Sequence, residues 1–261
     1  ELAGYRKQLA QPYLTDKEVT DKLIKEAFDR SKLEVRASHI LINCAPDASA
    51  KDSLAAFNKA MSLLKRAEKG ENFGTLAEKN SDDPSAKENK GDLGYFSSFT
   101  MVYPFESAAF SNAKGKISNP IRTRFGYHII KTVDIRPAQG EIKVAHLMIK
   151  SPKGESAEDS LKAVAKINEL YDRIKKGESF DDLTKQYSED KNSAPNAGVL
   201  QPFTTGRMVP EFENAAFALA KDGDISQPVK TSFGWHIVKR LEKKATPTFD
   251  EVKSDLKAKV G

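Results

Sequence analysis

An internal repeat of about 100 residues constrains this chain more than any other feature of its sequence. Three stretches of the first half recur in the second half in the same order and at nearly the same spacing: RASHILINC at 36–44 as KVAHLMIKS at 143–151, MVYPFESAAF at 101–110 as MVPEFENAAF at 208–217, and ISNPIRTRFGYHIIK at 117–131 as ISQPVKTSFGWHIVK at 225–239. A solenoid requires several shorter repeats, so two long copies predict two similar domains.

The pattern inside each copy predicts an α+β domain, in which a small, mostly antiparallel sheet of four strands packs with about four helices. The first strand is an aliphatic run, and the long helix after it has apolar residues at spacings of three and four. A Lys-Gly-Glu turn ends that helix, with glycine at a positive φ. The other elements expected are a short helix (73–79, 180–187), a brief strand (93–96, 200–203), a helix that begins near a proline, and a hairpin at Phe-Gly with its return strand (127–133, 235–241).

The repeat also sets the expected domain boundaries: a helical flank at 1–34, domain one at 35–135, a linker at 136–142, domain two at 143–243, and a second helical flank at 244–261. Thr15 and Glu18 form a candidate capping box in the first flank. Thr248 or Asp250 is expected to cap the helix of the second flank. Both flanks are therefore predicted to be helical.

Composition excludes several classes of function. The net charge of +5 comes from 42 basic and 37 acidic residues spread along the chain, which is not the clustered charge of a nucleic-acid interface. Cys44 is the only cysteine, so no intrachain disulfide and no cysteine-rich metal site can form. The apolar runs are too short for a membrane-spanning helix. The sequence begins at Glu1 and has no signal peptide, so we expect a processed protein or an excised fragment.

The histidines fall at matched positions, in the first and last predicted strands of the two copies: His39, His128, His146 and His236. If those strands are neighbours in the sheet, each pair of imidazoles comes face to face. One interpretation is a hydrogen-bonded core pair that fixes strand register. Metal binding is a second, with Asp83 or Asp190 as the third ligand, although we favour no metal. The hydroxyl residues nearby lack the elbow motif of a Ser-His-Asp nucleophile.

Together these segments resemble the parvulin (PpiC, rotamase) family of peptidyl-prolyl cis-trans isomerases. The resemblance rests on histidine in the first strand, SDD or SED, GDLGYF, M-V-x-x-F and FGYHII, an ordered set found twice, and it covers roughly 36–135 and 143–242. It implies catalytic roles for two histidines and one aspartate in each copy: His39, Asp83 and His128, and His146, Asp190 and His236. It implies a substrate-binding role for eight further residues: Leu93, Met101, Phe105, Thr123, Leu200, Met208, Phe212 and Thr231.

The resemblance implies a chemistry in which no bond is broken, so neither a nucleophile nor a cofactor is required. An apolar pocket would hold the proline ring and exclude water, and the carboxylate and imidazoles would set the polarity beside the rotating amide. Periodicity alone favours a core role over a pocket role for Leu93, Met101 and Phe105. Asp83 and Asp190 lie in polar segments, where aspartate commonly forms turns.

The two copies differ where copy one has Gly-Asp-Leu-Gly at 91–94 and copy two has Gly-Val-Leu-Gln at 198–201. We therefore expect copy one to be the better isomerase, and copy two to be slower or to act mainly in binding. Parvulins selective for phosphorylated substrates have an arginine-rich loop after the first strand. The corresponding stretch here, APDASAKDS at 45–53, is short and has little net charge, so no phosphate requirement is expected.

Tandem parvulin copies with helical flanks are similar to SurA-type periplasmic folding factors. This resemblance implies a periplasmic or otherwise extracytoplasmic location in bacteria. The expected partners are proline-containing unfolded or extended polypeptides, with no nucleic acid, and membrane proximity would come from regions absent from this chain. The alternative functions are a chaperone or adaptor that binds clients without turnover, and a purely structural repeat.

Overall fold

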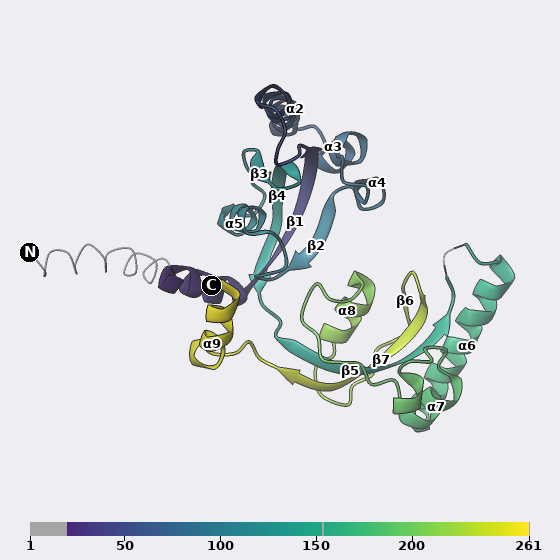
Figure 1. Ribbon diagram of the computed structural model, residues 1–261. Coiled ribbons are helices and arrows are strands. Elements are labelled where there is room, and N and C mark those ends of the chain that lie inside the picture. Colours follow the sequence, from purple (N-terminus) through teal and green to yellow (C-terminus); the bar gives the residue numbers. More distant parts are fainter. Residues whose placement is uncertain (1–19, 153, 261) are drawn as a thin grey trace, which may run out of the picture. The chain divides into compact units, whose positions relative to one another are not determined.

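The computed structural model describes residues 20–152 and 154–260, which form two compact units (Figure 1). The described residues up to 138, together with those from 247 to 260, make up unit one, and the described residues of 139–246 make up unit two. Each unit contains one antiparallel sheet with helices packed on it, so the predicted α+β class is confirmed. The predicted capping box of Thr15 and Glu18 lies outside the described residues.

Unit one contains a four-stranded sheet in the order β2-β1-β4-β3, in which every neighbouring pair is antiparallel. Its strands are β1 (Leu33–Asn43), β2 (Asp92–Phe96), β3 (Ile121–Thr123) and β4 (Gly126–Pro137). Its helices are α2 (Ala50–Glu68), α3 (Phe73–Asn80), α4 (Ala86–Asn89), α5 (Tyr103–Ser111) and α9 (Phe249–Val260), together with a helix at 20–31. The Lys-Gly-Glu turn after α2 has the expected glycine at positive φ, with Gly70 at +93°.

The two faces of this sheet are covered by different helices (Figure 1). Because successive side chains of a strand point to opposite faces, Ile40 and Ile42 of β1 pack with α2 and α3. Val35 and Ala37 pack with α5 on the other face. His39 shares that second face, since it alternates with Ile40. The sheet therefore presents the first histidine of the copy to α5.

Unit two repeats the arrangement around the strands β5 (Glu141–Lys150), β6 (Val229–Lys230) and β7 (Gly234–Lys244), in the order β5-β7-β6. Its helices are α6 (Ala157–Lys175), α7 (Phe180–Tyr187), the 3₁₀ turn η1 (Ala194–Asn196) and α8 (Pro210–Phe217). The fourth strand expected at 200–203 is replaced by two isolated bridges, Ala145 to Val199 and Ile142 to Phe203. Pro202 occupies the position that corresponds to Tyr95 of β2.

The long strands extend further than the sequence pattern predicts. β1 begins at Leu33, before the repeated stretch that starts at residue 36, and β4 continues to Pro137, beyond the expected end at residue 133. Glu34 in this extension is buried and accepts a hydrogen bond from Arg136 Nε at 2.7 Å, so a charged residue occupies an interior strand position. Because β5 begins at Glu141, only residues 138–140 lie between strands where we expected a linker at 136–142.

The helix at 20–31 and α9 pack against each other in unit one, although they come from opposite ends of the described chain (Figure 1). Ile24, Ala27 and Leu256 form their buried contact. Thr248 immediately precedes α9, and its N–H and its hydroxyl both donate to Glu251 Oε2, at 2.7 Å and 2.8 Å, which is one half of a capping box. Within the described ranges, none of the helices has the length and apolar character needed to cross a bilayer.

Candidate active site

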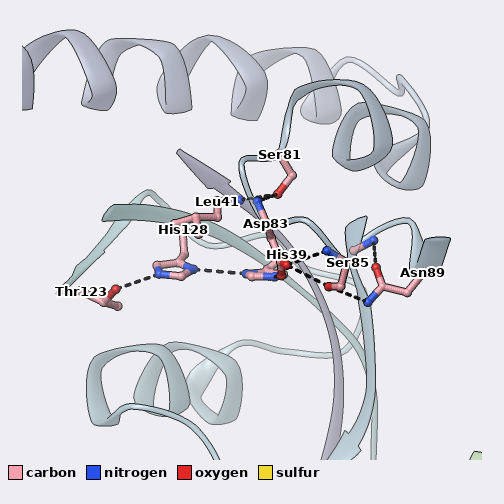
Figure 2. Close-up of polar contacts among 9 residues, drawn as sticks. His39, Leu41, Ser81, Asp83, Ser85, Asn89, Thr123 and His128 are labelled. Carbon is pink, nitrogen blue, oxygen red and sulfur yellow. Dashed lines mark hydrogen bonds and ion pairs between the residues drawn. The ribbon is translucent and has the colours of Figure 1, made fainter. Parts of the chain in front are cut away.

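Four polar side chains of copy one form a continuous series of hydrogen bonds, which we call the imidazole network (Figure 2). Asp83 Oδ2 lies 2.7 Å from His39 Nε2, and His39 Nδ1 lies 3.2 Å from His128 Nδ1. His128 Nε2 is in turn 2.8 Å from Thr123 Oγ1. Copy one therefore brings together one carboxylate, two imidazoles and one hydroxyl.

Strand register places the two imidazoles side by side. His39 of β1 pairs with Ile130 of β4, and His128 pairs with Leu41, so the histidines are diagonal neighbours on one face of the sheet. Their rings stack at 5.4 Å between centroids with an interplanar angle of 14°. Both side chains are buried. The face-to-face pairing follows directly from antiparallel strands and their two-residue period.

The segment that follows α3 holds Asp83 in place. Leu41 N donates to Ser81 Oγ at 3.0 Å, which ties the segment to β1. The backbone N–H and the hydroxyl of Ser85 both donate to Asp83 Oδ1, at 3.0 Å and 2.9 Å. Burial alone would raise the pKa of Asp83, but these bonds and the contact with His39 outweigh it and lower the pKa. The carboxylate is therefore ionised at neutral pH.

The hydrogen-bond partners fix the direction of every proton in the network. The carboxylate of Asp83 can only accept, so His39 Nε2 donates to it and His39 Nδ1 is left as an acceptor. His128 Nδ1 then donates to His39, and His128 Nε2 accepts from the Thr123 hydroxyl. Thr123 Oγ1 accepts in turn from Phe125 N at 3.1 Å. Both imidazoles are neutral in this arrangement.

The pKa shifts agree with neutral rings. Burial lowers the pKa of His39, although Asp83 favours its protonated form. Burial, together with a smaller effect of the neighbouring His39, lowers the pKa of His128 to about 4. Neither ring carries a charge near pH 7.

Copy two contains the same network with matching distances. His146 Nε2 is 2.9 Å from Asp190 Oδ2, and His146 Nδ1 is 3.2 Å from His236 Nδ1. Thr231 Oγ1 lies 2.8 Å from His236 Nε2, and burial again lowers the pKa of His236 to about 4. One difference is Ser193, whose hydroxyl lies 3.2 Å from His146 Nε2 and also donates to Asp190. Sequence reasoning missed this serine.

An apolar pocket lies beside the network of copy one. The Phe105 ring of α5 lies nearly perpendicular to both imidazoles. Its centroid is 5.5 Å from that of His39 and 5.3 Å from that of His128. A pocket of about 420 Å³, which we call the proline pocket, is bordered by these three rings together with Leu93 and Met101. The predicted apolar residues thus lie beside the predicted polar ones.

Thr123 differs from the other predicted residues of copy one, because it is not among the residues that line the proline pocket and instead contacts His128 on the ring nitrogen that faces away from His39. Sequence reasoning missed several residues that line the proline pocket: Leu41, Thr100, Val102, Arg124 and Phe125. The Arg-Phe-Gly hairpin turn was a usable signal for the last two, since it ends two residues before His128 in the sequence.

In copy two the predicted apolar residues also gather beside the imidazoles. Phe212 lies nearly perpendicular to His146 at 5.5 Å and to His236 at 5.4 Å. Leu200 and Met208 pack against the buried cluster that contains Phe212. The roles of these residues in binding and catalysis stay predictions in both copies.

A glycine in each copy allows the edge segment to approach the first histidine closely. Gly91 has φ of +79°, and a Cβ there would lie 2.4 Å from the carbonyl oxygen of His39. Gly198 has φ of +77° and would place a Cβ 2.0 Å from the carbonyl oxygen of His146. Only glycine fits at these two positions.

Beyond the glycine, the edges of the two copies diverge. In copy one Arg36 forms an ion pair with Asp92, whose Oδ1 also accepts from Gly94 N at 3.0 Å. Copy two has Val199 at the position of Asp92. This difference accompanies the complete strand β2 in copy one and the isolated bridges in copy two.

The model of the PPIC-type PPIASE domain matches this chain twice, at residues 22–136 and 130–244. Each match includes one imidazole network and its sheet. The chain belongs to this family. Among the described residues, no group of three or more histidine, cysteine, aspartate or glutamate side chains is placed to hold a metal ion.

Curated relatives of these two PPIC-type domains are named "Chaperone SurA". The relative from Pseudomonas fluorescens (strain Pf0-1) is 33% identical over 225 residues, which is 84% of this chain and 51% of the relative. The relative from Methylococcus capsulatus is 35% identical over 224 residues, or 84% of this chain and 48% of the relative. This chain thus spans about half the length of the curated relatives it matches.

Proposed function

We propose that this chain is a peptidyl-prolyl cis-trans isomerase that accelerates X-Pro rotation in unfolded or exported proteins. The observation that carries the proposal is the apolar proline pocket of copy one, which lies directly against two buried, neutral imidazoles. The matching network in copy two and the family membership support the same conclusion.

The reaction needs only a site that binds the twisted amide better than either planar form. Rotation about an X-Pro bond crosses a barrier of about 18–20 kcal/mol, and the planar amide is stabilised by charge-separated resonance. Leu93, Met101 and Phe105 would surround the pyrrolidine ring and exclude water from it. In such a site the polar resonance form is less well solvated, which favours the twisted state.

The network supports a non-covalent role for the histidines. His39 Nδ1 and His128 Nε2 both accept hydrogen bonds inside the network, so neither ring has a lone pair available to remove a proton from the substrate. Their buried rings would instead fix a polar wall beside the rotating amide. The isomerisation breaks no bond, so the mechanism requires no cofactor.

The arginines near the proline pocket support turnover without a phosphate requirement. Arg122 donates to the backbone carbonyls of Cys44 and Ala45, at 2.9 Å and 2.8 Å, which engages it in holding the loop after β1. Of the described residues that line the proline pocket, Arg124 alone has a permanent positive charge. A single arginine lacks the clustered charge that phosphate selectivity requires.

The relatives support a proposal for the clients and for the location. Relatives named as chaperones support the binding of unfolded or extended polypeptides, and we place the protein in the periplasm or another extracytoplasmic compartment. The same name favours a second candidate function, a chaperone built on PPIC-type folds that binds clients without turnover.

Magnetisation-exchange NMR on short Ala-Pro peptides distinguishes the two functions. The full chain is compared with Met101→Ala, Met208→Ala and the double variant, because methionine fills the pocket without forming part of the network. We expect Met101→Ala to lower the exchange rate about tenfold and Met208→Ala to lower it less than about twofold. If the intact chain leaves peptide exchange unchanged but still suppresses client aggregation, the chaperone function is correct and the isomerase proposal is wrong.

A further inference from the structure

A second pocket in unit one adjoins the proline pocket. It has a volume of about 350 Å³ and shares Met101 with its neighbour. We call it the side pocket. Its apolar lining comes from the helix at 20–31 and from the segment before α5: Leu23, Ala27, Phe99, Met101 and Tyr103. A peptide bound with its proline beside Met101 would therefore pass the entrance of the side pocket.

Phe99 in this pocket adopts a backbone conformation that phenylalanine disfavours. Its φ is +62°, in the left-handed region. Its counterpart in copy two is Gly206, at φ of +83°. Both turns are held in the same way, since Phe99 N donates to Glu106 Oε2 and Gly206 N donates to Glu213 Oε2, each at 2.8 Å. The turn therefore suits glycine, and its left-handed backbone conformation is roughly tenfold less favourable for phenylalanine than for glycine.

The ring of Phe99 gains little burial in return. It is 40% exposed, and it is not among the residues assigned to the apolar clusters of the described chain. Its recorded ring contact is with Lys259, whose Nζ lies 5.3 Å from the ring centroid. Packing within the protein thus does not account for a strained phenylalanine here, whereas contact with a bound client does.

Tyr103 is the second exposed aromatic residue of the side pocket. It is 54% exposed, and its hydroxyl donates to Glu26 Oε2 at 3.3 Å. Copy two has Pro210 at this position. Both exposed aromatic side chains are therefore specific to copy one.

Apart from Lys259, which lies over the Phe99 ring, the charged groups of the side pocket are paired with one another. Arg30 is buried and bonds to Glu26 and Glu106, and its Nη2 also lies 2.8 Å from Ser107 Oγ. The Arg30 guanidinium lies 5.3 Å from the centroid of the Tyr103 ring. Because these charges already have partners, the part of the pocket open to a ligand is its apolar wall.

We propose that the side pocket is a specificity subsite of copy one, in which Phe99 and Tyr103 receive a large uncharged apolar side chain of the client close to its proline. The proposal rests on the proposed function, because it assumes that a client proline binds beside Met101. It adds that copy one recognises apolar sequence around the proline and that copy two does not.

The test uses the full chain carrying Met208→Ala, so that copy one supplies the signal, and four peptides that place leucine or serine either before or after an Ala-Pro pair. Peptide affinity is measured by NMR titration and turnover by exchange. One leucine peptide should bind about fivefold more tightly than its serine partner. Phe99→Gly and, separately, Tyr103→Ala should abolish that difference while the serine peptides are turned over as before. Equal affinity of leucine and serine peptides for the unsubstituted pocket would overturn the proposal.

Measurements of folding stability distinguish a binding role of Phe99 from a structural role. Phe99→Gly should raise the folded-to-unfolded ratio of the protein about threefold, because it relieves the left-handed strain. Gly206→Phe, the reverse change in copy two, should lower it about tenfold. A Phe99→Gly chain that is less stable, or a Gly206→Phe chain of unchanged stability, would contradict the proposal. If no peptide is turned over yet leucine still improves affinity, the isomerase function fails and the subsite stands.

Discussion

Copy one and copy two have nearly identical imidazole networks but different surroundings. The distances between the two histidines are the same, 3.2 Å in each copy, and a phenylalanine stands beside both pairs. The differences lie outside the network: the complete strand β2, the exposed aromatic residues Phe99 and Tyr103, and the extra hydroxyl of Ser193. The comparison teaches that strand register fixes the same polar centre in both copies, whereas the segments around that centre are free to differ.

The network common to both copies predicts a shared loss of stability in acid. His128 and His236 have a folded-state pKa of about 4, below the unfolded value of about 6.5, so the unfolded chain binds more protons between those two values. The free energy of unfolding should therefore fall as the pH drops from about 6.5 to about 4, by roughly 3 kcal/mol per histidine.

Urea unfolding at a series of pH values measures this effect. The control is the double variant His128→Asn and His236→Asn, which lacks the titrating rings and should show a shallower pH dependence. Identical slopes for the two proteins would mean that other groups cause the acid sensitivity. A steeper pH dependence of the free energy of unfolding in one unit than in the other would show that the two networks are less alike than their distances suggest.

The substitutions Asp83→Ala and Asp190→Ala test whether Ser193 makes the stability of unit two less sensitive to the loss of its aspartate. Without Asp83 the buried Nε2–H of His39 loses its acceptor, which should cost about 2–3 kcal/mol in the stability of unit one. Without Asp190 the Ser193 hydroxyl remains within reach of His146, so the cost in unit two should be about 1 kcal/mol. Chemical denaturation followed by NMR signals from each unit gives both values.

The matched control for this pair is Ser193→Ala, combined with Asp190→Ala. The combined variant should restore the larger cost in unit two. Equal effects of the two single aspartate substitutions would show that the serine does not compensate.

The segment of copy two that corresponds to β2 predicts a smaller effect on local stability. Replacing Val199, Gln201 and Pro202 by Asp, Gly and Tyr gives copy two the sequence of β2 and places a carboxylate near Lys143, the counterpart of Arg36. We expect the edge of the second sheet to gain protection from amide exchange, by about 1 kcal/mol of local opening free energy. The control restores proline alone at position 202. If the control is protected equally, Pro202 is not the cause of the interrupted strand.

Much of the fold could be predicted because the domain sequence occurs twice in the chain. Each ambiguous segment has a second version, and the matched histidines indicated that the first and last strands are neighbours. The two-residue period of a strand then placed the rings on one face. The apolar residues next to those rings were named from a family resemblance, since periodicity does not distinguish a pocket wall from a core.

The rest depends on contacts between distant residues. Glu34 and Arg36 interrupt the apolar pattern of β1, and only their partners Arg136 and Asp92 show that charged residues belong in that strand. The packing of α9 on the helix at 20–31 is likewise invisible to local patterns. Phe99 is different, because the glycine at its matched position in copy two was a readable sign of a left-handed turn.

The pairing of the flank helices makes the second domain an insertion within the first. Unit one is built from both ends of the described chain, and unit two enters and leaves through the paired strands β5 and β7, where Glu141 lies opposite Lys244. Its two attachment points are thus adjacent. Residues 139–246 can be regarded as a cassette, which could be excised and its ends joined by a short turn without interrupting any helix or strand of the host domain.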